Sequence, residues 1–309
     1  MRANLSLEPD ASGYLHADYA RSFLEWAQAR LLYRSKGWIL ERLIPGTQCI
    51  DAMGCYPLFC CLDWTGLDTD LEELKHRCIS VSLVTDPFGD YSVELLEKSF
   101  DIVREYKHHF IIDPSAFSEN YLARKHRRNL DLAMKSVEIE RCARPQDYLD
   151  EWCSLFGHLC QRHGITGLRA FSRAALALQL SVPGLVMFRA TAGEQIVGLH
   201  LWYVQGPFGY GHLGATNELG YRLMASYALY WTAIEYFRGR VRMLDIGATP
   251  GPAATAESGL ARFKRGWSTG TRVVYFCGRI LDEVRYDQLC DSRGRAERFF
   301  PAYRADHIG

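Results

Sequence analysis

Residues 185–215, LVMFRATAGEQIVGLHLWYVQGPFGYGHLGA, decide the fold. Three runs rich in apolar, β-branched and aromatic residues lie within this stretch, at Leu185–Thr191, Gln195–Val204 and Phe208–Ala215. The segments between them are short and contain glycine, which favours tight reversals of the chain. The stretch therefore predicts three strands of an antiparallel meander.

Helical patterns flank this meander on both sides. After it, apolar residues recur at helical spacing along 223–237, and a short apolar strand follows. A strand that follows a crossover helix is expected to lie parallel to the strand before that helix. The expected elements around the meander are helices at 148–163 and 172–180, then a helix at 223–237, a strand at 241–246, a helix at 259–267 and a strand at 272–278.

The first half of the chain also mixes helix and strand patterns. The spacing of Phe23, Trp26, Ala27 and Leu31 predicts a helix within 19–43, and a period-two pattern predicts a strand at 79–84. A helix is expected at 92–106 and a strand near 109–112. Because 309 residues exceed the usual size of one core, we expect two α/β (α+β) domains, 1–145 and 146–309.

Composition narrows the classes of function. Thirty-six basic residues balance thirty-six acidic ones, so global charge favours neither nucleic acid nor a membrane surface as partner. The first residues lack the pattern of a signal peptide, and no apolar run is long enough for a membrane span. Ten cysteines without paired CxxC spacing are expected to be reduced, so we expect a cytoplasmic protein without a structural metal.

A resemblance to a known family rests on several segments. The order of expected elements resembles the GNAT acyltransferase fold. The run LDIG at 244–247, followed by GLARFKRGW at 259–267, is similar to a strand-then-helix motif of the FemABX-like and polysaccharide-biosynthesis acyltransferases. Residues 212–217, 225–235 and 125–129 also resemble that subgroup. Its members often pair two GNAT-like halves, so the resemblance implies a GNAT-type mixed sheet flanked by helices, with a degenerate N-terminal half and a catalytic C-terminal half.

The resemblance implies an N-acyltransferase that uses acyl-CoA, acetyl-CoA in standard members, to acylate an amine of a small or sugar-like acceptor. Standard members bind the donor pyrophosphate on a glycine-rich loop at a helix N-terminus. The corresponding residues 217–224, NELGYRLM, hold one glycine, an acid and a bulky Tyr221. Acetyl-CoA, a longer acyl-CoA and aminoacyl-tRNA therefore stay open as donors.

Two other functions also stay open. One is FemABX-like aminoacyl transfer from tRNA, although the sequence has no heptad pattern for the coiled-coil arm that such enzymes often carry for tRNA. The other is a catalytically inert GNAT-like scaffold that binds a phosphate-bearing ligand or a partner chain. The basic run Arg124–Arg128 suits phosphate or RNA, but a solvated helix turn is the simpler interpretation. The sequence leaves the oligomeric state undetermined.

Candidate catalytic residues follow from where the GNAT fold places its site, near residues 209–215 and 244–247. His212 lies between glycines and is our candidate general base, since imidazole titrates near working pH. A half-buried histidine that bonds a neighbour is the alternative. Asp245, at the end of a strand, either orients the acceptor amine or caps the following loop.

Candidate binding residues surround these positions. By the resemblance, Lys264 contacts a phosphate or carbonyl of the substrate, and Arg262 and Arg265 add charge that pairs with phosphate oxygens. A solvated basic helix face is the alternative for these three residues. Three further residues are expected where the substrate approaches the backbone: Gly214, Asn217 and Gly247.

The first half contributes a candidate acceptor cleft. Asp51, Tyr56 and Asp86 are polar or aromatic residues in expected loops, where binding residues tend to lie. We expect them to form the acceptor side of a cleft between the two halves.

Overall fold

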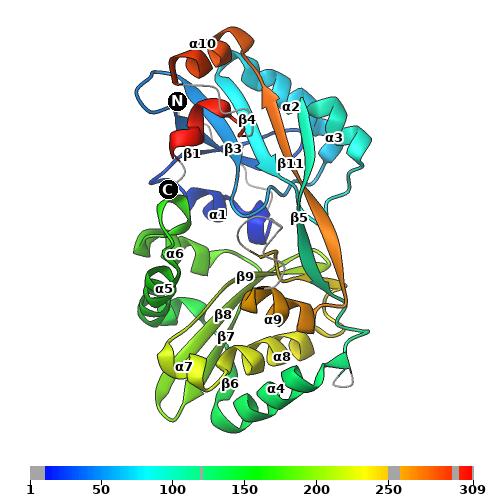
Figure 1. Cartoon of the computed structure of the whole chain (residues 1–309), viewed down its shortest axis with the longest axis vertical. Helices are drawn as coiled ribbons and strands as arrows, with labels where there is room; N and C mark the ends of the chain where they lie inside the picture. The colour runs from blue at the N-terminus through cyan, green and yellow to red at the C-terminus, as the bar shows by residue number, and fades with distance from the viewer. Residues whose placement is uncertain (1–10, 119–120, 250–257, 294–298, 308–309) are drawn as a thin grey trace. The chain divides into compact units, whose positions relative to one another are not determined.

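The protein forms two compact units of mixed α/β structure (Figure 1). A computed structural model describes residues 11–118, 121–249, 258–293 and 299–307. Unit 1 takes Met1–Gly13, His108–Thr166 and Ala170–Arg272, and unit 2 takes Tyr14–Lys107, Gly167–Arg169 and Val273–Gly309. The units are therefore interleaved along the chain, and strands β5 (Ile102–Ile112) and β11 (Gly270–Ile280) contribute residues to both.

Unit 1 is built on a mixed sheet in the order β5-β10-β9-β8-β7-β6. The expected meander is present, because β8 pairs antiparallel with both β7 and β9. As predicted, β10 lies parallel to β9, and β5 then pairs antiparallel with β10. The strands that belong only to unit 1 are β6 (Glu138–Cys142), β7 (Leu185–Ala192), β8 (Gln195–Gln205), β9 (Phe208–Thr216) and β10 (Met243–Asp245).

Helices cover both faces of this sheet. On one face, α4 packs against α8, and residues from α4, α8 and α9 join a large apolar cluster with Trp202 and Leu244 of the strands. On the other face, α5 packs on β8 and β9, with α6 beside it. The helices of unit 1 are α4 (Arg124–Ser136), α5 (Leu149–His163), α6 (Arg173–Ser181), α7 (Glu218–Arg222), α8 (Ala225–Phe237) and α9 (Gly259–Trp267).

Local sequence sets the ends of these helices. Ser172 begins α6 and Ser258 begins α9, each through a hydroxyl that accepts a bond from a backbone N–H in the first turn. Gly164 ends α5 in the left-handed conformation, with φ of 59°, which glycine adopts without strain. These caps lie close to the helix ends that the sequence predicts.

Unit 2 has its own mixed sheet in the order β1-β2-β3-β4-β11. Strands β3 and β4 are parallel, and the other neighbouring strands for which a register is resolved are antiparallel. The elements that belong only to unit 2 are α1 (Ala17–Arg21), β1 (Gln28–Leu31), β2 (Trp38–Leu43), β3 (Ile50–Gly54), α2 (Leu67–Glu73), β4 (Cys78–Val84), α3 (Val93–Ser99) and α10 (Glu283–Arg293). Short 3-10 helices occur in the chain at Gly13–Leu15, Trp64–Gly66, Leu74–His76, Pro145–Tyr148, Gly167–Arg169 and Ala302–His307.

The helix predicted within 19–43 is wrong. The segment forms α1 and then an antiparallel pair, β1 with β2. Trp26, one of the residues that suggested a helical stripe, is 52% exposed, so that spacing does not mark a buried face. The chain reverses at Lys36, with φ of 59°, and at Gly37, where a β-carbon would lie 2.5 Å from the Phe59 ring. The helix predicted at 92–106 likewise ends at Ser99, after which β5 begins at Ile102.

The compact units do not follow a single cut in the chain. A division into 1–145 and 146–309 separates α4 and β6 from the sheet and helices of unit 1, and it separates the last residues from unit 2. The division into 1–145 and 146–309 therefore remains a prediction about how two GNAT-like halves compose the chain. Among the described helices, none has the length and apolar character that a bilayer crossing requires.

Candidate functional site

The parallel strands β9 and β10 part after a short pairing. Their register covers three residue pairs, from Met243 with Phe208 to Asp245 with Tyr210. β10 ends there, whereas β9 continues to Thr216. The pairing is close because Gly209 has no side chain, and a β-carbon there would lie 2.5 Å from Leu244. In unit 1, the pairing therefore ends where we expect the two strands of a GNAT site to separate.

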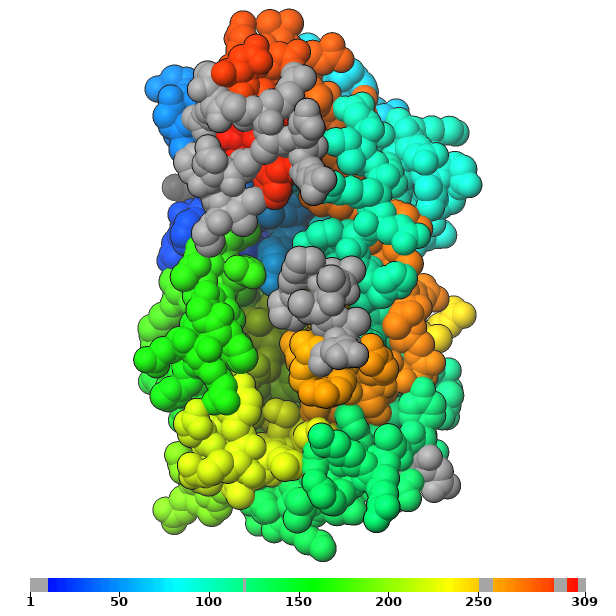
Figure 2. All heavy atoms as spheres, viewed as in Figure 1, coloured from blue at the N-terminus to red at the C-terminus, as the bar shows by residue number. Residues whose placement is uncertain are grey.

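A hollow lies beside these strands on the surface of unit 1. In Figure 2 it separates the green α5 and α6 from the orange α9, and olive strand residues form its floor. The candidate site residues lie on two sides of the sheet, and the strand registers tell which side each one takes.

The register assigns Asp245 to the α6 side of the sheet. Asp245 is the partner of Tyr210, and Tyr210 is in turn the partner of Tyr203 on β8, so the three side chains share one face. The Tyr203 hydroxyl donates to the backbone carbonyl of Gln179 in α6, at 2.9 Å. Leu244, one residue earlier, takes the opposite face and packs with α8.

Asp245 forms a buried pair with His109 of β5. The His109 Nδ1 lies 3.0 and 2.9 Å from the two carboxylate oxygens of Asp245. Both residues are buried, at 7% and 3% exposure. The backbone N–H of Gly247 donates to the same carboxylate at 2.7 Å. Asp245 therefore holds an imidazole and also caps the loop after β10.

Lys264 approaches the loop after β10 from α9. Its ammonium group donates to the backbone carbonyl of Ala248 at 2.8 Å. Gly247 adopts a left-handed φ of 72°, and a β-carbon there would lie 3.3 Å from the Lys264 Nζ. The glycine therefore allows the ammonium group to lie against the backbone. Arg262 and Arg265 are exposed on the same helix, whereas Lys264 is half-buried.

His200 and Tyr230 lie on the α8 side of the sheet, next to the separated part of β9. Their rings are 4.6 Å apart, and His200 also lies 4.8 Å from Trp202. A β-carbon at Gly214 would approach the His200 ring to 3.0 Å, so this glycine makes room for the imidazole. His200 is 4% exposed, and its Nδ1 has no hydrogen-bond partner among the described residues.

Burial decides the charge state of this pair. Desolvation, with a smaller contribution from Lys264, lowers the pKa of His200 to about 3. Burial, and to a lesser degree the Asp245 carboxylate, raises the pKa of Tyr230. Both side chains are therefore neutral at neutral pH, and a neutral phenol is a hydrogen-bond donor.

His212 lies on the α6 side, two residues beyond the partner of Asp245. Its Nε2 lies 3.2 Å from the Gln179 side-chain oxygen, and its ring stacks on Tyr203 at 4.5 Å. Desolvation lowers the pKa of His212 to about 3. The two residues that we predicted as catalytic, His212 and Asp245, therefore share one face of the sheet, but His212 is a weak base in this setting.

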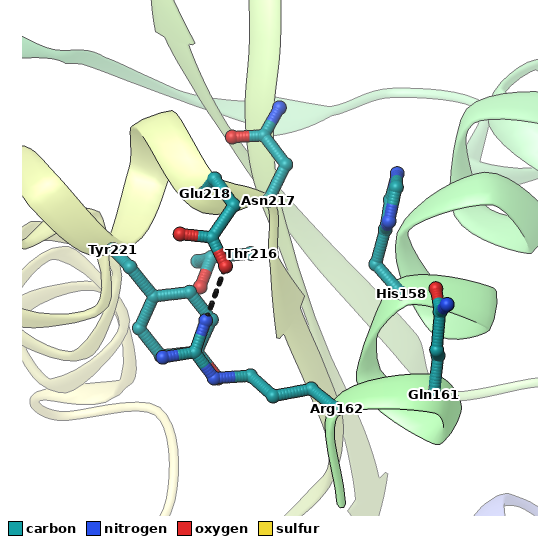
Figure 3. Close-up of a pocket in the computed structure, with 7 residues that line it drawn as sticks. All are labelled: His158, Gln161, Arg162, Thr216, Asn217, Glu218 and Tyr221. Atoms are coloured by element: carbon teal, nitrogen blue, oxygen red, sulfur yellow. Dashed lines mark hydrogen bonds and ion pairs between the residues drawn. The ribbon is translucent and has the colours of Figure 1, made fainter.

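Asn217 lies elsewhere, at the start of α7. Its side-chain oxygen accepts from the backbone N–H of Gly220 at 2.9 Å, which caps that short helix. It also lines a pocket of about 300 Å³ between α5 and α7, shown in Figure 3. In this pocket Arg162 pairs with Glu218 at 2.6 Å and lies over the Tyr221 ring at 3.9 Å. None of these contacts of Asn217 involves Lys264, so they do not group the two predicted binding residues.

The three residues predicted for the acceptor cleft all lie in unit 2. Asp51 is fully buried, at 0% exposure, and forms ion pairs with Arg42 and Arg304. Asp86 is buried at 5% and accepts from the backbone N–H of Phe88 at 2.9 Å. Tyr56 is partly exposed, and its backbone carbonyl accepts a bond from Tyr19. Asp51 and Asp86 thus have stabilising contacts inside unit 2, and the acceptor role remains a prediction.

Sequence reasoning missed three side chains of this site: His109, His200 and Tyr230. Among the described residues, no group of His, Cys, Asp or Glu side chains could hold a metal ion. A local signal did exist for His200, because it is a polar residue inside the continuous apolar run of β8.

Comparisons with known proteins identify the fold. A model of the acetyltransferase (GNAT) domain matches residues 119–265. FemX has a similar structure, with a TM-score of 0.66 and 14% identity over 90% of this chain and 95% of its own. The C-terminal domain of a protein described as a lysylphosphatidylglycerol synthetase from Agrobacterium fabrum gives 0.64 and 13%, over 90% of this chain and 92% of its own.

A third similar structure is L-PGS from Bacillus licheniformis, with a TM-score of 0.55 and 12% identity over 87% of this chain and 93% of its own. At such identities the likeness establishes the fold alone. A search of the curated proteins found no match. The fold class expected from the sequence, a GNAT-type mixed sheet flanked by helices, is confirmed.

Proposed function

We propose that this chain, whose residues 119–265 match the acetyltransferase (GNAT) domain, transfers an acyl group from acyl-CoA to the amine of a small or sugar-like acceptor. The observation that carries the proposal is the separation of β9 from β10, with the Lys264 ammonium group at the loop where β10 ends. A thioester bound at this place lies beside the Lys264 ammonium group and beside the part of β9 that does not pair with β10.

The reaction needs few chemical groups. The acceptor nitrogen forms a bond to the thioester carbonyl carbon, the carbon–sulphur bond breaks, and the nitrogen loses a proton. Charge develops on the carbonyl oxygen, and a preorganised cation or hydrogen-bond donor stabilises it. Lys264 supplies that cation in this proposal, or contacts a donor phosphate, and Asp245 orients the amine side of the reaction.

The remaining predicted residues have supporting roles in this proposal. Because Gly247 has no side chain, the Lys264 ammonium group can lie close to the backbone there, and Gly214 likewise leaves space for the His200 ring. Arg262 and Arg265 are exposed on α9 and suit the phosphates of a long donor. No disulfide joins any of the ten cysteines, all of which lie in the described residues, and this supports a reducing compartment such as the cytoplasm for the proposed enzyme.

The proposal is tested by turnover and by the variant Lys264→Met. The purified protein is incubated with acetyl-CoA or longer acyl-CoAs and a panel of amines and amino-sugars, and free CoA thiol is measured. We expect turnover, with kcat/KM about 100-fold lower or more in Lys264→Met because its methionine keeps the apolar stem but removes the charge. The matched control is Lys135→Met at an exposed lysine of α4, with unchanged kcat/KM.

Two results contradict this proposal. The absence of thiol release with every donor and amine contradicts acyl-CoA as the donor. Equal loss of activity in Lys264→Met and Lys135→Met contradicts the role of Lys264, because only one of these ammonium groups lies at the end of β10.

Aminoacyl transfer from tRNA is the second candidate function. One observation favours it: α4 begins with exposed basic residues and packs on α9, through a contact of 3.0 Å between the His126 Nε2 and the Phe263 carbonyl. Arg124, Lys125, Arg128 and Arg262 thus belong to two packed helices, and cations of this kind suit a phosphate backbone. Transfer from aminoacyl-tRNA, with no release of thiol from any acyl-CoA, would favour this candidate over the first.

A further inference from the structure

The orientation of the Asp245–His109 pair determines which nitrogen carries the proton. An ionised carboxylate only accepts hydrogen bonds, and the His109 Nδ1 lies within 3.0 Å of both oxygens. Nδ1 therefore carries the ring proton, and the lone pair of the neutral imidazole lies on Nε2. This is the tautomer that a histidine needs in order to accept a proton through Nε2.

The backbone holds the pair in one arrangement. The Gly247 N–H donates to Asp245 Oδ1 at 2.7 Å. The Ile246 N–H donates to the Phe110 carbonyl at 3.0 Å, and the Phe110 N–H donates to the Gly247 carbonyl at 3.2 Å. The backbone of Phe110, the residue after His109, thus bonds to Ile246 and Gly247, the two residues that follow Asp245. These bonds fix the backbone of β5 beside the end of β10, so the His109 and Asp245 side chains meet across neighbouring strands.

The other imidazoles near the separated strands are poorer proton acceptors. His212 bonds Gln179 and His200 stacks on Tyr230, and both lie in desolvated positions that disfavour a positive charge. His126 is held by the Phe263 carbonyl on α9. Among the described histidines of this region, His109 alone has a carboxylate partner that stabilises the imidazolium.

We propose that His109 is the general base of the acyl transfer and that Asp245 is the positioning residue that holds its tautomer and stabilises its cation. The inference rests on the proposed transfer to an amine. The acceptor nitrogen bonds the thioester carbon, its proton passes to the His109 Nε2, and the thiolate leaves and takes a proton from water. The imidazolium then returns its proton to solvent.

The variant His109→Asn separates a catalytic role from a structural one. The asparagine amide nitrogen can replace Nδ1 as donor to Asp245, so the contact that stabilises the fold is kept while the Nε2 base is removed. We expect kcat/KM to fall by about 10²- to 10⁴-fold, with the melting temperature and the dissociation constant for acyl-CoA unchanged. The matched control, His163→Asn at an exposed histidine in the last turn of α5, keeps the wild-type kcat/KM.

A second variant and a measurement on the wild type guard against a folding defect. In His109→Ala, added imidazole is expected to restore part of the lost activity, because a free base can enter the space left by the ring. Nitrogen NMR of labelled histidine in the wild type is expected to show the proton of His109 on Nδ1. An Nε2-protonated ring overturns the proposal without any assay of activity.

The outcomes distinguish the proposed acyl transfer from the role of His109 as its general base. Wild-type transfer together with undiminished transfer by His109→Asn overturns the role of His109 and leaves the proposed function intact. Failure of the wild type to transfer from any acyl-CoA overturns both, since no proton is then released to a base. A loss of activity in His109→Asn that imidazole restores in His109→Ala supports both.

Discussion

Two desolvated imidazoles on opposite faces of the unit 1 sheet, the buried His200 and the half-buried His212, are linked to the stability of the folded state. Each is neutral because its environment disfavours the charged ring, and desolvation is the main cause in both. His200 lies among aromatic rings on the α8 side, and His212 lies against Gln179 on the α6 side. Neither residue can gain a proton without losing part of the stability of unit 1.

Acid should therefore destabilise the fold through these residues. Their folded pKa values, lowered to about 3, lie below the ordinary histidine value near 6.5, so the unfolded chain binds more protons between these limits. The unfolding free energy is expected to fall as pH decreases from 6.5, by about 1.4 kcal/mol per pH unit for each histidine. Urea unfolding at pH 7, 6 and 5 measures this slope. The variant His212→Asn should have a shallower slope, and an unchanged slope would contradict the assignment.

At the scale of elements, the contact between α4 and α9 sets where Lys264 lies. Gly266 of α9 lies against the His126 ring of α4, and a β-carbon there would come within 2.1 Å of the imidazole. Trp267, the next residue, is fully buried in the cluster that joins these helices to the sheet. The position of α9 therefore depends on a residue without a side chain.

Gly266→Ala should destabilise unit 1. The added methyl group overlaps the buried His126 ring, so α9 or α4 must shift, at a cost of about 1–3 kcal/mol. The matched control is Gly157→Ala in the middle of α5, where no atom lies within 4 Å of the new methyl group. The control should gain about 0.5–1 kcal/mol because alanine restricts the unfolded chain. Chemical denaturation compares the two variants, and a neutral Gly266→Ala would show that the helices adjust freely.

At the scale of the whole molecule, each compact unit is assembled from distant segments. Unit 1 takes β6 and α4 from before residue 145, and unit 2 takes α10 and the described C-terminal residues from after it. In unit 2, Arg304 pairs with Asp51, which is 253 positions earlier and fully buried. An isolated half that begins at residue 146 would lack the unit 1 residues of β5, all of β6, and helix α4 of its core.

Truncation tests this interleaving. A fragment of residues 146–309 lacks α4, which packs on α8 and contributes Leu130 and Ala133 to the main apolar cluster. We expect this fragment to unfold without a cooperative transition, whereas residues 108–272, which hold most of unit 1, should show one. Thermal melts followed by circular dichroism compare the fragments. A cooperative melt of 146–309 alone would support the single boundary that the sequence suggests.

The sequence by itself determined the order of elements in the second half. Apolar periodicity and turn glycines are local properties, and they were sufficient to predict the meander, the parallel β10 and helix α9. The same periodicity failed in the N-terminal segment, where Trp26 is exposed and the chain forms paired strands instead of a long helix. Local spacing is informative only where the apolar residues face a core.

Only the tertiary structure decided which side chains meet. His109 and Asp245 are 136 positions apart, and His126 and Phe263 are 137 apart, so no spacing in the sequence links them. Asp245 is a candidate from the sequence because it lies at the end of a predicted strand, and Lys264 is one because of the resemblance to the acyltransferase subgroup. The sequence did not show that His109 lies beside Asp245 or that His212 bonds Gln179, because partners across a sheet depend on strand order and register, which arise from the packing of distant segments.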